Sequence, residues 1–177
     1  LPARLARETS RFIADNQDRP FLAYLSFYSV HTPLMGRPDL VRKYNKKAAA
    51  INGEEFASEE QVIGNKPRKV RILQKHAVYA AMVEAMDEAV GSVLNQLEKS
   101  GLADNTIVFF TSDNGGLSTS EGSPTSNLPL RGGKGWGYDG GLRAPWIVRY
   151  PGITQPGTVS DQPICSIDLL PTISAAA

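Results

Sequence analysis

The chain has 177 residues, enough for one sizeable hydrophobic core, and 41% of them are hydrophobic and 21% charged. This balance excludes an intrinsically disordered chain, and the formal net charge of +1 leaves no global field that would recruit nucleic acid or an anionic membrane. No continuous apolar stretch is long enough to predict a membrane-spanning helix. The single cysteine, Cys165, permits neither an internal disulfide nor a cysteine-based zinc site.

The first third of the chain alternates between a helix, an apolar run and a polar stretch. Residues 1–16 have the spacing of an amphipathic helix, and the start carries neither an initiator Met nor the apolar core of a signal peptide. Residues 20–27 form a nearly continuous apolar run, which predicts a strand buried on both faces. A loop with His31 follows, and then residues 38–69 are polar and weakly periodic, as expected of a surface excursion with short helices.

The clearest element is a long helix over residues 75–100. Its apolar residues recur every three or four positions, which places them in one stripe on one helix face. Lys99 near the end and Gly101 just beyond it are typical of a helix stop. The stripe, which predicts core packing rather than a ligand site, consists of Val78, Met82, Met86, Val90, Val93 and Leu97.

Two further strands and a last helix complete the predicted order. The apolar runs 106–111 and 144–150 predict strands, separated by the glycine-rich stretch 115–141. A helix is predicted to begin at Ser166, which can act as its N-cap. Alternating helices and strands predict an α/β fold with a mostly parallel sheet flanked by helices.

Polar residues follow two of these predicted strands. In a parallel α/β sheet, ligands bind outside the carboxyl ends of the strands. His31 lies beyond the first strand, and Asp113 and Asn114 follow the second. A carboxylate and an amide carbonyl are hard oxygen donors suited to Ca²⁺ or Mg²⁺. The same letters, followed by Gly115, are also a strong signal for a simple Asx turn, so the residues alone leave both readings open.

The two histidines also allow more than one explanation. An imidazole at His31 can donate to an anionic oxygen or serve as a general acid, but a loop histidine can equally cap its own backbone. The other histidine, His76, stands at the start of the long helix, where solvent or helix-end packing accounts for it.

The densest signal is the glycine-rich stretch around Lys134. Glycines flank this lysine on both sides, so its ammonium can approach a ligand beside bare backbone N–H groups and hold an oxyanion. It is not a P-loop, because Gly135 stands where Ser or Thr is required. Residues 135–140 match G-x-G-x-x-G, but Pro145 lies where the helix of that motif should run. The alternative is a flexible surface loop, for which Trp136 and the nearby arginines are an odd composition.

Together these segments resemble the sulfatase family of the alkaline-phosphatase superfamily, in family order and over nearly the whole chain. The combination of Thr-Ser-Asp-Asn-Gly at 111–115 with Arg-Gly-Gly-Lys-Gly at 131–135 is the most specific part. Asp139 stands where many relatives have Glu, which is a mild departure. The other matching segments are residues 20–27, 30–34, 79–91, 101–110, 139–145, 150–152 and 167–172.

The resemblance implies an arylsulfatase-like hydrolase that cleaves sulfate esters. It implies that Asp113 and Asn114 are two ligands of a catalytic Ca²⁺, and that His31 and Lys134 bind the sulfate oxygens and help the leaving oxygen depart. The family nucleophile is a formylglycine made from Cys or Ser in a C/S-x-P/A-S-R motif, which this chain lacks; Cys165 does not stand in that context. We therefore expect the chain to be the central portion of a single catalytic domain, and to hydrolyse no aryl sulfate when isolated.

Two other functions remain open from the sequence. One is a phosphate mono- or diesterase of the same superfamily, although its relatives with two transition metals need more histidines than the two present. The other is a non-catalytic module that binds a sulfated glycan. The loop 117–130 and the basic excursion 38–69 are expected to border the pocket, and the sequence does not settle which sulfate ester is bound. Family habit implies a periplasmic or secreted protein.

Overall fold

The computed structural model describes residues 1–59 and 67–177. Within these ranges, no helix is both long enough and apolar enough to cross a bilayer. The helices are α1 (Pro2–Asp15), α2 (Pro38–Ala49), α3 (Ala77–Lys99), α4 (Asp139–Leu142) and α5 (Leu169–Ala176), with the 3-10 turns η1 (Ala103–Asn105) and η2 (Ser166–Asp168). The strands are β1 (Phe56–Glu59), β2 (Arg68–Arg71), β3 (Val108–Thr111) and β4 (Trp146–Arg149).

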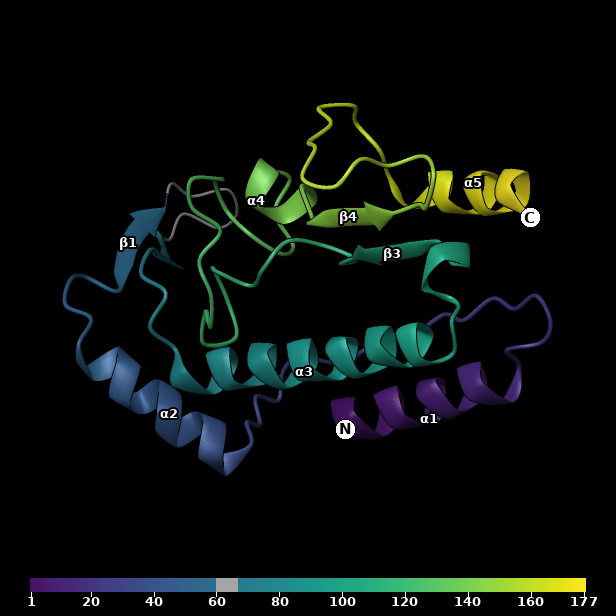
Figure 1. The fold of residues 1–177 in the computed structure, drawn as a ribbon. Helices are drawn as coiled ribbons and strands as arrows, with labels where there is room; N and C mark the ends of the chain where they lie inside the picture. The colour runs from purple at the N-terminus through teal and green to yellow at the C-terminus, as the bar shows by residue number, and fades with distance from the viewer. Residues whose placement is uncertain (60–66) are drawn as a thin grey trace.

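Helix α3 is the central element of the fold. Helices α1 and α2 both pack against it, and Figure 1 shows α1 on one side of α3 and the β3–β4 pair on the other. The best-buried apolar side chains come from these helices: Ala6, Ile13, Leu40, Ala81, Met82, Ala89 and Leu97. The predicted helices at 1–16 and 75–100 are therefore confirmed. Of the predicted stripe on α3, Met82 and Leu97 are buried and the other four residues are half-buried.

Specific contacts fix both ends of α3. His76 is the N-cap residue, and its Nδ1 atom accepts a hydrogen bond from the backbone N–H of Tyr79 at 3.2 Å. Capping of this kind satisfies one of the N–H groups that the first helical turn leaves without a partner. Beyond the helix, Gly101 adopts a left-handed conformation with φ of 68°, which is the backbone geometry that ends helices at glycine.

The strand pairing differs from the prediction. Strands β3 and β4 pair antiparallel, with Phe109 opposite Val148, and β1 pairs antiparallel with β2. The described residues contain these two two-stranded sheets and no parallel pair, so the predicted mostly parallel sheet is wrong for them. The apolar runs at 106–111 and 144–150 do form strands, which the local pattern predicted; the direction of pairing depends on contacts far apart in the chain.

The predicted strand at residues 20–27 is not formed. Residues 20–27 belong to no helix or strand, and no described strand pairs with them. Their side chains are also not buried on both faces, since Leu22 is 69% exposed and Tyr24 is 90% exposed. The segment leads from the end of α1 to the loop that carries His31.

The polar excursion contains more structure than short helices. Within residues 38–69, α2 buries Leu40 against the core, and β1 and β2 form a hairpin-like pair. Residues 60–66 of the excursion lie outside the described residues. At the other end of the chain, Ser166 is not the N-cap. Cys165 occupies that position before η2, and Asp168 accepts a hydrogen bond from its backbone N–H at 2.8 Å.

The glycine-rich stretch packs backbone against backbone. The N–H of Gly115 donates to the carbonyl of Gly141 at 3.0 Å, and a Cβ atom on Gly115 would overlap the carbonyl of Gly140. A Cβ atom on Gly133 would overlap the carbonyl oxygen of Gly116. Residues 115–116 and 132–141 can approach this closely only because these positions have no side chain.

The intervening segment, residues 117–127, is anchored to the region where β2 leads into α3. The backbone N–H of Arg71 donates to the carbonyl of Ser118, and the Arg71 guanidinium donates to the carbonyl of Ser123. Arg71 is only 5% exposed and forms an ion pair with Glu55 at 3.0 Å. Gln74 adds hydrogen bonds to the Thr125 hydroxyl and the Ser126 carbonyl. Buried polar contacts therefore order a segment that has no helix or strand of its own.

The His76 cap makes the stability of the protein depend on pH. Burial, followed by the charge of Arg71, lowers the pKa of His76 from its ordinary value of 6.5. The capping contribution is therefore complete above about pH 6.5 and is lost as the pH falls through the lowered folded-state value, because a proton on Nδ1 removes the acceptor. Asn caps at any pH. The unfolding free energy of His76→Asn should therefore rise relative to that of the wild type by up to about 1 kcal/mol as the pH is lowered. Denaturant titrations at several pH values measure this difference, and a constant difference from pH 8 to pH 5 would contradict the role of His76.

The backbone contact at Gly115 predicts a sharp contrast between glycines. Gly115→Ala should lower the unfolding free energy by about 1–3 kcal/mol, because the new methyl group forces apart two backbone segments. Gly137→Ala is the matched control, since a Cβ atom there meets nothing within 4 Å, and it should change the value by less than about 0.5 kcal/mol. Equal effects of the two substitutions, measured by chemical denaturation, would show that the close contact does not constrain the fold.

Candidate functional site

The structure brings two of the predicted residues into direct contact. Lys134 Nζ lies 2.6 Å from His31 Nε2, although 103 positions separate them in the chain. His31 is exposed and Lys134 is half-buried, so both side chains reach the surface. Two potential donors that converge at one accessible point can bind one anionic oxygen group between them.

The hydrogen-bond partners of His31 indicate one tautomer for its neutral form. The Nδ1 atom lies 2.9 Å from the carbonyl oxygen of Thr32, which can only accept. A neutral His31 therefore carries its proton on Nδ1, and Nε2 is left to accept from the Lys134 ammonium, which can only donate.

The His31 loop also contacts the segment 117–127. The Thr32 hydroxyl donates to Glu121 Oε2 at 2.8 Å, and the same hydroxyl lies 3.3 Å from His31 Nδ1. Glu121 is exposed and adopts a left-handed backbone conformation with φ of 49°. The contact places a carboxylate beside the histidine loop and ties that loop to the anchored segment.

Asp113 and Asn114 form a tight polar turn directly after β3. The Ser112 hydroxyl donates to the backbone carbonyl of Asn114 at 2.9 Å, and the Asn114 side-chain N–H₂ donates to the carbonyl of Gly115 at 3.0 Å. The two residues lie at a backbone bend, but among the described residues neither side-chain oxygen accepts from a following backbone N–H as in an Asx turn. The Asn114 side chain directs its donor group to the backbone, which leaves its carbonyl oxygen as an available ligand.

This turn fits part of a Ca²⁺ site. The Asp113 carboxylate is exposed, and its one hydrogen bond among the described residues is a long contact of 3.5 Å from Ser112. One carboxylate and one amide oxygen have the chemistry that Ca²⁺ prefers, but the ion takes six to eight oxygen ligands. No group of three or more acidic, histidine or cysteine side chains with metal-binding geometry occurs in residues 1–59 and 67–177.

One backbone hydrogen bond connects the two halves of the site. The N–H of Lys134 donates to the carbonyl of Gly116 at 3.0 Å. Gly116 lies two residues after Asn114, so this bond holds the lysine backbone close to the Asp113–Asn114 segment. Among the described residues, no hydrogen bond or ion pair joins the Asp113 or Asn114 side chains to His31 or Lys134 themselves. The structure thus places all four predicted residues on neighbouring segments and brings two of them into contact.

The loop around Lys134 is not a free linker. The Arg131 guanidinium lies over the Tyr138 ring at 4.1 Å from its centroid and pairs with Glu59 at 2.8 Å. Trp136 lies beside Tyr138, with ring centroids 6.1 Å apart. These contacts and the glycine packing hold Lys134 in place, which argues against the flexible-loop alternative.

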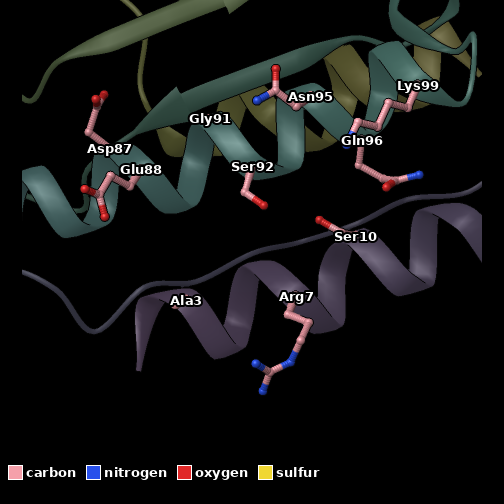
Figure 2. Close-up of a pocket in the computed structure, with 10 residues that line it drawn as sticks. All are labelled: Ala3, Arg7, Ser10, Asp87, Glu88, Gly91, Ser92, Asn95, Gln96 and Lys99. Carbon is pink, nitrogen blue, oxygen red and sulfur yellow. The ribbon is translucent and has the colours of Figure 1, made fainter.

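A separate groove lies between α1 and α3, away from this pair. It encloses about 760 Å³ and is lined largely by polar and charged residues, among them Arg7, Asp87 and Lys99. Figure 2 shows Ser10 of α1 and Ser92 of α3 directed across it. None of the four predicted site residues lines this groove.

Three residues that shape the site were not predicted from the sequence. Glu121, Arg71 and Asn127 each make a hydrogen bond to a position more than eight residues away, as in the pairing of Asn127 with Gly116. Glu121 and Asn127 stand among Ser, Gly and Pro, where they look like ordinary turn residues. Arg71 carries no local signal that distinguishes it from the other basic residues.

Comparison with known proteins gives a consistent result. The family description Sulfatase matches residues 1–177, the entire chain. A sulfatase of Formosa agariphila is 39% identical over 90% of this chain, and the steryl-sulfatase of Rattus norvegicus is 37% identical over all of it. In both cases the chain spans about a quarter, 26%, of the length of the relative.

The fold is also similar to that of a solved structure. The crystal structure of Ps i-CgsB in complex with k-i-k-neocarrahexaose superimposes on 99% of this chain with a TM-score of 0.76 and 28% identity, and the match covers 33% of that protein. The described α/β arrangement is thus part of a sulfatase-like domain. On the match over every residue, this chain belongs to the sulfatase family.

Proposed function

We propose that the chain is the central portion of a sulfatase catalytic domain, and that the whole protein hydrolyses sulfate esters. The observation that carries the proposal is the contact of 2.6 Å between Lys134 and His31 beside the Asp113–Asn114 turn. Family membership supports the reaction class, and the Lys134–His31 pair is where the sulfate group would bind.

Lys134 and His31 would bind the sulfate oxygens together. The Lys134 ammonium supplies a full positive charge, and it is held by backbone packing rather than by an acidic partner among the described residues. Charge that develops on the sulfate oxygens during cleavage is stabilised most by donors that are already in position. When an anion enters, Lys134 can turn from His31 to an anionic oxygen, and the exposed His31 can take up a solvent proton on Nε2 and donate it to the leaving oxygen.

Asp113 and Asn114 would contribute two oxygen ligands to a Ca²⁺ ion, which would supply further positive charge next to the sulfate group. The sequence contains no C/S-x-P/A-S-R motif for a formylglycine nucleophile, and residues 1–59 and 67–177 contain no group of three or more side chains that could complete a metal site. Cys165 is exposed and caps η2, so it has a structural explanation of its own.

For the substrate class, the proposal rests on a similar structure. The site is open, and the oligosaccharide bound to the similar Ps i-CgsB structure makes a sulfated glycan the substrate we favour. An aryl or steryl sulfate remains the second choice, in line with the steryl-sulfatase of Rattus norvegicus. We also propose a periplasmic or secreted location, in keeping with the habit of the family.

Removal of Lys134 tests the proposal. In the full-length protein, Lys134→Ala should lower kcat for 4-nitrocatechol sulfate by about 10²–10³-fold, the size of effect typical of losing one donor that stabilises transition-state charge. Lys46→Ala is the control, since Lys46 is an exposed lysine of α2, and it should leave kcat within twofold. Initial rates with 4-nitrophenyl phosphate are measured in parallel.

The outcomes separate the alternatives. Faster turnover of the phosphate ester than of the sulfate ester would assign the protein to phosphoester hydrolysis. Binding of a sulfated glycan with no turnover of either ester would assign it to a binding module. If Lys134→Ala were as active as Lys46→Ala, Lys134 would have no role in the reaction.

A further inference from the structure

Asn127 makes an unusually complete set of hydrogen bonds for a loop side chain. Its Oδ1 atom accepts from the N–H of Gly116 at 3.0 Å. Its Nδ2 atom donates to the carbonyl of the same Gly116 at 2.7 Å and to the carbonyl of Gly132 at 2.9 Å. The side-chain amide therefore pairs with the Gly116 backbone at two points, as a neighbouring strand would, and reaches a second segment with its remaining hydrogen.

The two segments that Asn127 joins are those that carry the proposed functional groups. Gly116 lies two residues after Asn114, and Gly132 lies two residues before Lys134. The Gly116 carbonyl that accepts from Asn127 also accepts from the backbone N–H of Lys134 at 3.0 Å. One side chain thus binds Gly116, which accepts from the Lys134 N–H, and also Gly132, which lies two residues before Lys134 in the same loop.

The packing leaves little freedom for a substitute. A Cβ atom on Gly133 would overlap the Gly116 carbonyl and would lie 2.9 Å from Asn127 Nδ2, so the amide lies directly against bare backbone. Asp at position 127 would keep the acceptor, lose both donors and direct a carboxylate at two carbonyl oxygens. Ala would leave the Gly116 N–H without a partner among the described residues, whereas the Gly116 and Gly132 carbonyls would keep the Lys134 N–H and the Ser118 hydroxyl as donors. An unpaired N–H in a half-buried place is costly.

We propose that Asn127 is a positioning residue for the sulfatase reaction: it fixes Lys134 relative to the Asp113–Asn114 turn without touching the substrate. The catalytic part of this inference rests on the proposed function. Displacements of about 1 Å in a positioned group can lower rates on the order of 10²-fold, so a loop tie of this kind has a kinetic consequence.

The kinetic test uses the full-length protein with Asn127→Ala and Asn127→Asp. Both variants should lower kcat for 4-nitrocatechol sulfate by roughly 10–100-fold. Ser126→Ala is the matched control, because among the described residues this neighbouring hydroxyl makes one hydrogen bond, accepted from the Leu128 N–H at 3.4 Å; the variant should stay within twofold of the wild type in kcat. In a Lys134→Ala background, adding Asn127→Ala should lower kcat by less than about a further threefold, because the effect of Asn127 acts through the lysine.

The structural test does not depend on catalysis. Hydrogen exchange of the Gly116 and Lys134 amides should be faster in Asn127→Ala than in Ser126→Ala, beyond any change in the global unfolding free energy. If the wild type cleaves no sulfate ester, the proposed function fails and exchange alone decides: faster exchange at these two amides supports the tie, and unchanged exchange overturns it. If the wild type is active, an Asn127→Ala variant within twofold of it, or losses that multiply fully with Lys134→Ala, would overturn the positioning role.

Discussion

The arrangement of the site depends on backbone segments that touch where glycines leave no side chain between them. Gly115 lies against Gly140, and Gly116 lies against Gly133, so the end of β3 and the Lys134 loop approach to hydrogen-bonding distance. Such contact is directional, because each carbonyl must meet an N–H, and it admits one register. The polar residues on either side of the contact inherit their positions from it.

A glycine-rich segment gains this rigidity only if other groups offset its conformational entropy. The buried Arg71 guanidinium and the Gln74 amide hold residues 118–126 to the start of the α3 region, and Asn127 holds the segment's end to Gly116 and Gly132. Thr32 and Glu121 then link the His31 loop to the same segment. The histidine and the lysine thus reach each other from distant parts of the chain through one continuous set of polar contacts.

Local patterns predicted the elements that depend on local physics. The helices α1 and α3 follow from apolar spacing, and the strands β3 and β4 follow from short apolar runs bounded by turn residues. Strand direction and the pairing of residues 20–27 depend on which distant segments lie alongside, and both predictions were wrong for the described residues. A buried-looking apolar run specifies a preference for being covered, but not the partner that covers it.

The site was predictable in the same uneven way. His31, Asp113, Asn114 and Lys134 were chosen because their chemistry stands out against turn residues, and the structure places them on neighbouring segments. Asn127 and Glu121 are residue types common in loops, so their roles become apparent only from their contacts in the structure. The metal-binding roles of Asp113 and Asn114 and the catalytic roles of His31 and Lys134 remain predictions, whereas membership of the sulfatase family rests on a match over the entire chain.

The most direct test of this account is a crystal structure of the full-length protein grown with Ca²⁺ and inorganic sulfate. The account predicts one sulfate ion with oxygens within hydrogen-bonding distance of both Lys134 Nζ and His31 Nε2, and a Ca²⁺ ion bound by oxygens of Asp113 and Asn114. A sulfate ion bound elsewhere in the domain, with the Lys134–His31 contact intact and no cation at the turn, would contradict it.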